Sequence, residues 1–237
     1  MRPAISFITI SRDRNSQEAG FIHTIQSNYS DCEIIIAAQQ EEGLFKHGQL
    51  RNLGYKKSQA PLVVFMDIDV RFLDKLDFEV AMYEHNHPLL MFDKSFVVEE
   101  RNLVVYRRPR YITHCIGRLI CFTREQFEAC GGYSNLCLGW GWEDNLLYER
   151  AKLKKIPGRI GHIIHPEIWG EEIHQKQNKY IFQTDNERQP ELDGFRQTVA
   201  GVRSLEQTNN IHRYNFSKIT VPADFAYRDL LVNRRTV

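Results

Sequence analysis

The sequence predicts an α/β protein in which helices cover both faces of a sheet. Strand-like and helix-like segments alternate through the first half of the chain, the order typical of this fold class. One of these segments, Leu62–Met66, is apolar at every position, as in a strand that is buried on both faces. Of the 237 residues 42% are hydrophobic and 26% are charged, which is ordinary globular usage in a chain long enough to bury a core.

The first half supplies three strands and two helices. A strand is expected at Ile5–Ile10, followed by a polar turn at Ser11–Ser16, and Ser16 is expected to cap a helix that carries Phe21, Ile22 and Ile25 on one side. An isoleucine-rich strand at Cys32–Ala38, a helix at Phe45–Ser58 and the apolar strand Leu62–Met66 complete this half.

The second half has a looser pattern. Strands are expected at Leu89–Phe92, Leu103–Tyr106, Ile116–Phe122 and Ile160–Ile164, and helices between Thr123 and Gly131–Gly132 and over Glu143–Lys154. Thr123 and Gln126 form the sequence pattern of a capping box for the first of these helices. The chain from His174 onward is polar and predicts no clear element. Because no repeat or linker interrupts the chain, residues 1–237 are expected to form a single domain.

Charge and cysteine content exclude several classes of protein. The 31 Lys and Arg residues against 30 Asp and Glu residues give a net charge of +1, which argues against a nucleic-acid-binding protein. The longest apolar stretch is too short to span a bilayer, and the N-terminus lacks the pattern of a signal peptide. The five cysteines are odd in number and form no C-x-x-C pair, so we expect reduced thiols in a cytoplasmic protein without structural zinc.

Two aspartates, Asp67 and Asp69, directly follow the buried strand Leu62–Met66. Ligands gather at the carboxyl ends of the strands in an open α/β sheet. Two carboxylates at that edge suit a divalent cation that also holds phosphate oxygens. The alternative is an acidic loop that caps the next helix.

The segment Leu138–Asp144, with the sequence LGWGWED, combines flexible glycines, aromatic faces and two acids. Tryptophan rings offer flat apolar surfaces to a sugar, and each also carries a polar N–H group. Glu143 and Asp144 are expected at the start of a helix, whose dipole favours ionised carboxylates. One of the two can then act as a general base. A helix start beside two buried tryptophans is the structural alternative.

Histidine and arginine residues complete the set of candidates. His165, next to Pro166, is the stronger candidate metal ligand, because imidazole mixed with carboxylate suits manganese-like ions, and His162 and His174 are the rivals for a second position. The other histidines, among them His47, are interpreted as structural. Arginines that suit diphosphate oxygens are Arg12 and Arg14 in the turn after the first strand and Arg51 in the helix before Asp67.

Taken in order, these motifs resemble GT-A glycosyltransferases of the β-1,4-galactosyltransferase and chondroitin-synthase group. The segments that carry the resemblance are Ile10–Arg14, Arg51–Gly54, Phe65–Asp69, Gly139–Asp144, His162–His165 and Asp193–Phe195. The resemblance implies the GT-A (Rossmann-like) fold with a mostly parallel twisted sheet. It divides the domain into a nucleotide-binding half (about 1–100), an acceptor and metal half (about 101–210) and a C-terminal extension (211–237).

The resemblance also implies a metal-dependent, inverting transfer of galactose, N-acetylgalactosamine or a related hexose from a UDP-sugar to a saccharide hydroxyl. Asp144 then matches the catalytic base, Glu143 and Trp142 bind the acceptor, and Asp69, His165 and His162 hold Mn²⁺, with Mg²⁺ as the alternative ion. Arg12, Arg14, Arg51, Asp67 and Trp140 would contact the nucleotide-sugar.

Two departures from the group bear on specificity. Trp142 stands where the animal enzymes have glycine, which would narrow or shift the acceptor pocket, and Cys115 stands where they have a bulky residue near C2 of the sugar. A smaller residue there would admit an N-acetyl group. The absence of the animal enzymes' anchor suggests a bacterial or phage-type enzyme of surface polysaccharide synthesis. The competing hypotheses are an inactive carbohydrate-binding scaffold on the same fold and a nucleotidyltransferase.

Overall fold

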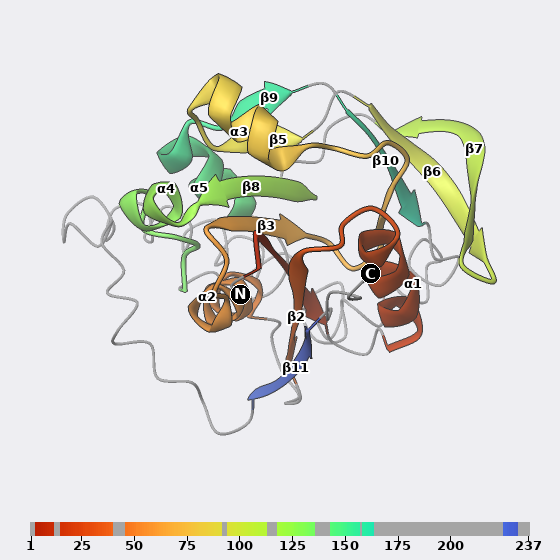
Figure 1. Cartoon of the computed structure of the whole chain (residues 1–237), viewed down its shortest axis with the longest axis horizontal. Helices are drawn as coiled ribbons and strands as arrows, with labels where there is room; N and C mark the ends of the chain where they lie inside the picture. Colours follow the sequence, from red (N-terminus) through yellow and green to blue (C-terminus); the bar gives the residue numbers. More distant parts are fainter. Residues whose placement is uncertain are drawn as a thin grey trace, which may run out of the picture.

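The structure, a computed structural model, describes residues 3–11, 15–39, 46–91, 94–112, 118–135, 143–156, 158–163 and 225–231 (Figure 1). Its strands are β1 (Ile5–Ser11), β2 (Cys32–Gln39), β3 (Leu62–Met66), β4 (Val70–Phe72), β5 (Leu89–Met91), β6 (Lys94–Arg101), β7 (Val104–Ile112), β8 (Leu119–Thr123), β9 (Lys154–Ile156), β10 (Arg159–Ile163) and β11 (Phe225–Leu231). Its helices are α1 (Asn15–Gln26), α2 (His47–Lys57), α3 (Phe78–His85), α4 (Arg124–Ala129) and α5 (Glu143–Ala151).

The larger sheet has seven strands in the order β11-β2-β1-β3-β8-β5-β9. Its centre is parallel, because β1 pairs in parallel with both β2 and β3, and Ile5 lies opposite Cys32 on one side and Leu62 on the other. Antiparallel pairings of β3 with β8 and of β2 with β11 flank this centre, while β5 pairs antiparallel to β8 and parallel to β9. The sheet is therefore mixed, with the three expected strands of the first half at its parallel centre.

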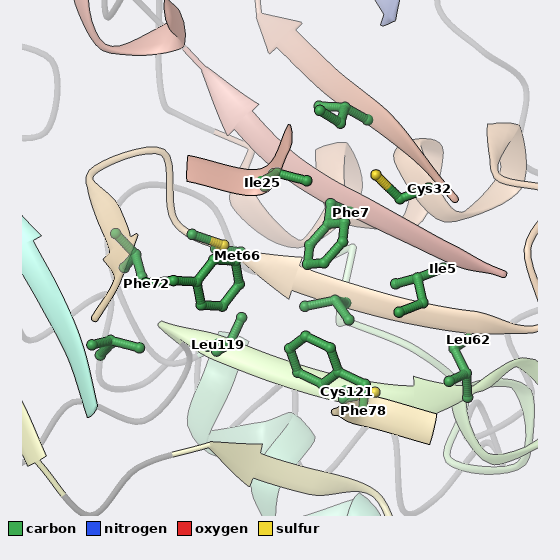
Figure 2. Close-up of a cluster of buried hydrophobic side chains, with 14 of the residues drawn as sticks. Ile5, Phe7, Ile25, Cys32, Leu62, Met66, Phe72, Phe78, Leu119 and Cys121 are labelled. Atoms are coloured by element: carbon green, nitrogen blue, oxygen red, sulfur yellow. The ribbon is translucent and has the colours of Figure 1, made fainter. Parts of the chain in front are cut away.

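Helices cover both faces of this sheet, as the sequence predicts. Phe7 and Val64 point to the face covered by α1 and α3, where Phe78 of α3 packs edge-on against Phe7 with ring centroids 5.9 Å apart (Figure 2). Ile8 and Phe65, one residue further along β1 and β3, pack instead with buried residues of α2, α4 and α5. The alternation of side chains along each strand thus divides the core into two layers.

The smaller sheet holds the segment that follows Asp67 and Asp69. Its order is β4-β10-β6-β7, in which β4 pairs antiparallel and β6 pairs parallel to β10. The chain leaves β3, turns through residues 67–69 and enters β4, and the Val70 N–H donates to the Asp67 carbonyl within this turn at 3.0 Å. The two aspartates therefore lie at the junction of the two sheets.

Most of the expected elements are confirmed, and the differences have local causes. The capping box of Thr123 and Gln126 is present at the start of α4. The predicted N-cap Ser16 is wrong, because α1 begins one residue earlier and Ser16 lies inside its first turn. The helix expected to reach Lys154 ends at Ala151, since Lys152 has a φ of 50° and the chain then forms β9.

Five elements were not predicted from the sequence: β4, α3, β6, β9 and β11. The strand expected at Leu103–Tyr106 is part of the longer hairpin of β6 and β7, whose turn residues Asn102 and Leu103 have φ of 50° and 64°. Helix α3 is capped by the Asp77 side chain, which accepts from the Val80 N–H. No helix in the described part of the chain is long and apolar enough to cross a membrane. The cysteines described, Cys32, Cys121 and Cys130, are free thiols.

Candidate active site

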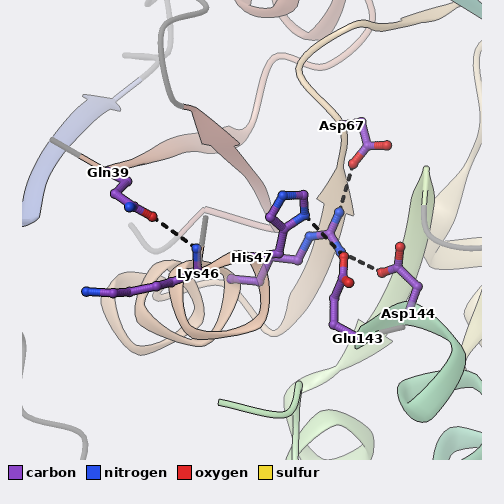
Figure 3. Close-up of polar contacts among 7 residues, drawn as sticks. Gln39, Lys46, His47, Asp67, Glu143 and Asp144 are labelled. Atoms are coloured by element: carbon purple, nitrogen blue, oxygen red, sulfur yellow. Dashed lines mark hydrogen bonds and ion pairs between the residues drawn. The ribbon is translucent and has the colours of Figure 1, made fainter. Parts of the chain in front are cut away.

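The Arg51 guanidinium lies at the centre of the candidate site and contacts three carboxylates. Its Nη2 donates to Asp67 Oδ1 at 2.8 Å, and its Nη1 donates to Asp144 Oδ1 at 2.5 Å and lies 3.5 Å from Glu143 Oε1 (Figure 3). Arg51 itself is only 4% exposed. One buried cation thus joins the acid that follows β3 to the two acids that open α5.

The side-chain alternation along β3 explains why Asp67 meets Arg51. Val63 and Phe65 point to the face covered by α2 and α5, so the next odd-numbered residue leaves the strand on that face. Helix α2 is held against the carboxyl end of β2, because the Lys46 backbone N–H donates to the Gln39 side chain at 3.0 Å. The strand order and the helix position together bring the guanidinium to the carboxyl edge of the sheet.

Histidine 47 also belongs to the site, contrary to its interpretation as structural. Its Nδ1 lies 3.2 Å from Glu143 Oε1. His47 and Arg51 are four residues apart in α2 and therefore share one face of the helix. This spacing is the signal in the sequence that could have identified His47 as a partner of the acids.

The pKa of Glu143 and that of Asp144 are displaced in opposite directions. Burial alone would raise the pKa of Glu143, but the hydrogen bond and charge of His47, together with Arg51, outweigh it and lower this pKa to about 2. Burial raises the pKa of Asp144 to about 8; Arg51 opposes this shift, and the negative charges of Glu143 and Asp67 add to it. Two adjacent acids with separated pKa values are typical of a pair with different roles.

Access to solvent also differs between the two acids. The Asp144 side chain is 21% exposed, whereas Glu143 is almost wholly buried. Glu143 Oε2 has no hydrogen-bond partner among the described residues. A buried carboxylate oxygen in a polar site is a strong acceptor for a hydroxyl group.

Asparagine 52 fixes the approach of the chain to the GWGWED segment. Its Nδ2 donates to the Tyr133 carbonyl and to Asn135 Oδ1, each at 2.8 Å, and its Oδ1 accepts from the Tyr133 N–H at 2.9 Å. The backbone of α2 touches the chain ahead of this segment at Gly48, where an added Cβ would collide with the Ser134 carbonyl oxygen. Adjacent residues of α2 therefore anchor both the acids and the chain that leads toward them.

The turn that carries Asp69 is held by backbone contacts from two sides. The Asp67 N–H donates to the Arg118 carbonyl at 3.0 Å, and the Ile163 N–H donates to the Asp69 carbonyl at 2.9 Å. His162 pairs with Val70 in the ladder between β10 and β4. The backbone of β10 at His162 and Ile163 therefore runs beside Asp69, which is 6% exposed.

Several predicted site residues lie outside the described part of the chain. These are Arg12, Arg14, Trp140, Trp142, His165 and the alternative ligand His174, together with Cys115 and the Asp193–Phe195 segment. Arg51, Asp67, Glu143 and Asp144 are brought together as described, and Asp69 lies in the same turn as Asp67. Among the described residues, no three His, Cys, Asp or Glu side chains are grouped closely enough to form a metal site by themselves.

Comparison with known proteins points to one group. A family model described as the N-terminal domain of galactosyltransferase matches residues 101–172. The human β-1,4-galactosyltransferase 4 is 28% identical over 171 residues, which is 67% of this chain and 46% of that protein. A β-1,4-N-acetylglucosaminyltransferase of Lymnaea stagnalis is 30% identical over 131 residues, or 54% of this chain and 25% of that protein. The chain thus spans about half the length of the first of these relatives and a quarter of the second.

Solved structures show the same fold. The catalytic domain of Drosophila β-1,4-galactosyltransferase 7 in complex with xylobiose aligns with a TM-score of 0.55 and 17% identity, over 76% of this chain and 81% of that one. A variant of that enzyme in complex with manganese, UDP-Gal and xylobiose aligns with a TM-score of 0.52 and 18% identity, over 69% of this chain and 71% of that one. These findings confirm the resemblance seen in the sequence: the chain has the GT-A fold, and its similarity is to the β-1,4-galactosyltransferase group.

Proposed function

We propose that this chain is a metal-dependent, inverting glycosyltransferase that moves a hexose from a UDP-sugar to a hydroxyl of a saccharide acceptor. The observation that carries the proposal is the contact of one buried guanidinium, Arg51, with Asp67 at the carboxyl end of β3 and with Glu143 and Asp144 at the start of α5. In an open α/β sheet the nucleotide binds at that edge, so the cluster joins a donor side to an acceptor side. The similarity to galactosyltransferases supports this choice of reaction.

Galactose and N-acetylgalactosamine are the proposed donor sugars. The relatives include both a galactosyltransferase and an N-acetylglucosaminyltransferase, so the group accepts sugars with and without an N-acetyl group at C2. Synthesis of a surface polysaccharide remains the proposed role.

The residues present fit a divalent metal. Asp69 supplies a carboxylate, and the end of β10 lies beside it because the Ile163 N–H bonds the Asp69 carbonyl. His165 follows two residues later in the sequence, and the combination of carboxylate and imidazole is one that Mn²⁺ accepts. Asp69, His165 and His162 would hold the ion, with Mg²⁺ as the alternative. When bound, the metal would neutralise charge on the diphosphate of the donor.

Asp144 would act as the general base. As the acceptor oxygen bonds to the anomeric carbon from the face opposite the diphosphate, the bond from that carbon to the diphosphate oxygen breaks and UDP leaves. Asp144 takes the proton of the attacking hydroxyl. A pKa of about 8 leaves the carboxylate basic enough to take this proton near neutral pH.

Glu143 would orient the acceptor and stay ionised throughout. Its lowered pKa keeps it unprotonated at physiological pH, so it only accepts hydrogen bonds. Its buried Oε2 has no hydrogen-bond partner among the described residues, and we assign it a hydroxyl of the acceptor as partner. Trp140 and Trp142 are proposed to flank the sugars and exclude water, and Arg12 and Arg14 to contact the nucleotide. Asp67 and Arg51 would complete the nucleotide-sugar site.

The test is to measure product release from a panel of UDP-sugars with saccharide acceptors, with and without Mn²⁺. We expect one sugar to give Mn²⁺-dependent formation of UDP and of an elongated saccharide. Release of pyrophosphate would instead identify a nucleotidyltransferase. Binding of saccharide without turnover of any UDP-sugar would identify an inactive scaffold.

Two variants separate the proposed roles. Asp144→Asn should keep donor binding and lose transfer by about 10²–10⁴-fold, because it removes the base and leaves the metal residue in place. Asp69→Ala should abolish Mn²⁺-dependent UDP binding. If Asp144→Asn lost UDP binding, or if Asp69→Ala kept it, the assigned roles would be wrong.

A further inference from the structure

Arginine 71, in β4, is wholly buried although it carries a charge, and it belongs to no part of the proposed reaction. Its Nη1 donates to the carbonyls of Ile68 and Val70, each at 2.9 Å. Its Nε and Nη2 donate to Glu100 Oε1 and Oε2 at 3.2 and 2.7 Å, and Nη2 lies 3.4 Å from the Gln17 carbonyl. The guanidinium thus links the turn after β3 to α1 and to β6.

The two carbonyls that Arg71 binds lie on either side of Asp69. Peptide groups are planar, so a carbonyl held in one direction fixes the orientation of the whole peptide unit. The units that begin at Ile68 and at Val70 are both held by the same nitrogen. Because the Ile163 N–H also binds the Asp69 carbonyl, the peptide unit between these two is held as well. The direction in which the Asp69 side chain leaves the backbone is therefore set largely by Arg71 and β10.

Glu100 and Gly20 complete the arrangement. Glu100 binds the guanidinium through two nitrogens, a geometry that fixes its plane as well as its position. A Cβ at residue 20 of α1 would collide with Glu100 Oε2 and with Arg71 Nη2, so glycine is what allows the ion pair to lie against the helix. The pair fills a site that α1, β4 and β6 form together.

We propose that Arg71 is a positioning residue of the metal site, which orients Asp69 through the carbonyls on either side of it and is itself oriented by Glu100. This inference rests on the proposed function, since it requires a metal at Asp69. Lysine cannot replace the arginine, because one ammonium group cannot reach two backbone carbonyls and both carboxylate oxygens in these directions.

The first measurement is Mn²⁺ binding in the presence of saturating UDP, with free Mn²⁺ followed by electron paramagnetic resonance, at a temperature where thermal unfolding shows every variant to be folded. Arg71→Lys should weaken Mn²⁺ binding by about 10–100-fold, the range typical of lost partners of a metal ligand. The matched control is Arg159→Lys, which alters an arginine that is 51% exposed and binds Asp74 through two nitrogens, outside the site. The control should bind Mn²⁺ like the unaltered chain.

Glu100→Gln covers the case in which Arg71→Lys does not fold. It keeps the shape of the side chain and removes its charge, and it should weaken Mn²⁺ binding in the same direction by a smaller factor. Unchanged Mn²⁺ binding in the folded variants, even with a lowered unfolding temperature, would show a purely structural role and overturn this inference alone. If UDP binding by the unaltered chain did not depend on Mn²⁺, both the proposed function and the inference would be wrong.

Discussion

The pKa of Asp144 predicts a specific pH dependence of sugar transfer. With a pKa of about 8, roughly one tenth of the Asp144 carboxyls are ionised at pH 7 and roughly nine tenths at pH 9. Because the ionised form is the proposed base, the turnover number should rise about tenfold from pH 7 to pH 9 and then level off. The assay is the initial rate of UDP formation with saturating donor, acceptor and Mn²⁺ across this range.

Variants of the neighbouring charges should move this profile in opposite directions. The negative charge of Glu143 helps to raise the pKa of Asp144, so Glu143→Gln should shift the midpoint to lower pH. Arg51 lowers that pKa, so Arg51→Met should shift the midpoint to higher pH in whatever activity remains. Asp74→Asn is the control, because Asp74 pairs with Arg159 outside the site and should leave the midpoint unchanged. A flat profile from pH 6 to 9, or the same midpoint in all variants, would refute the assignment of Asp144 as the titrating base.

Three substitutions, of which Arg51→Met is already named above, test the framework around the acids. Arg51→Met leaves the buried carboxylate of Glu143, and the partly buried ones of Asp67 and Asp144, without their cation. It should lower the free energy of unfolding by about 3–5 kcal/mol, measured by urea denaturation at pH 7, and a loss below about 1 kcal/mol would contradict the role of the cluster. His47→Ala removes a hydrogen bond to Glu143 and should raise the KM for the acceptor about 3–10-fold while the KM for the donor changes little. A larger effect on the KM for the donor would contradict the proposed role of Glu143 in acceptor binding. Gly48→Ala forces a Cβ onto the Ser134 carbonyl and should lower the free energy of unfolding by about 1–3 kcal/mol in the same assay. An unchanged midpoint of urea denaturation would show that the backbone at Ser134 can move without cost.

The parallel centre of the fold was predictable because its strands are apolar on both faces. The prediction of Leu62–Met66 agrees with β3 at both ends, and the carboxyl-edge position of Asp67 follows from it. The strands β4 and β9 were missed because each has three residues and gains its stability from ladder partners distant in the sequence. Segments this short carry too few residues for a pattern of alternation to stand out.

The site was predictable as a set of residue types but not as a set of contacts. Asp144 and Glu143 were identified by their place at the start of a helix, which the structure confirms. Arg51 was expected to face the nucleotide. Nothing in the sequence indicates its distance from α5, because that helix begins 92 residues further along the chain. His47 was interpreted as structural because a lone histidine usually is, and its role appears only when α2 and α5 meet.

The position of Arg51 explains how acids on separate elements can share one small region. Asp67, Glu143 and Asp144 repel one another when ionised, and each loses hydration on burial, so a cluster of three would not form without a buried cation. The cation comes from α2. Asn52 of the same helix bonds the Tyr133 backbone and the Asn135 side chain ahead of α5. A shift of α2 would therefore move Asp67, the proposed base Asp144 and the chain ahead of the GWGWED segment together. In the proposed reaction, coupling between the donor and acceptor sides would then reside in one helix, and the neighbouring residues Arg51 and Asn52 would share one geometric constraint.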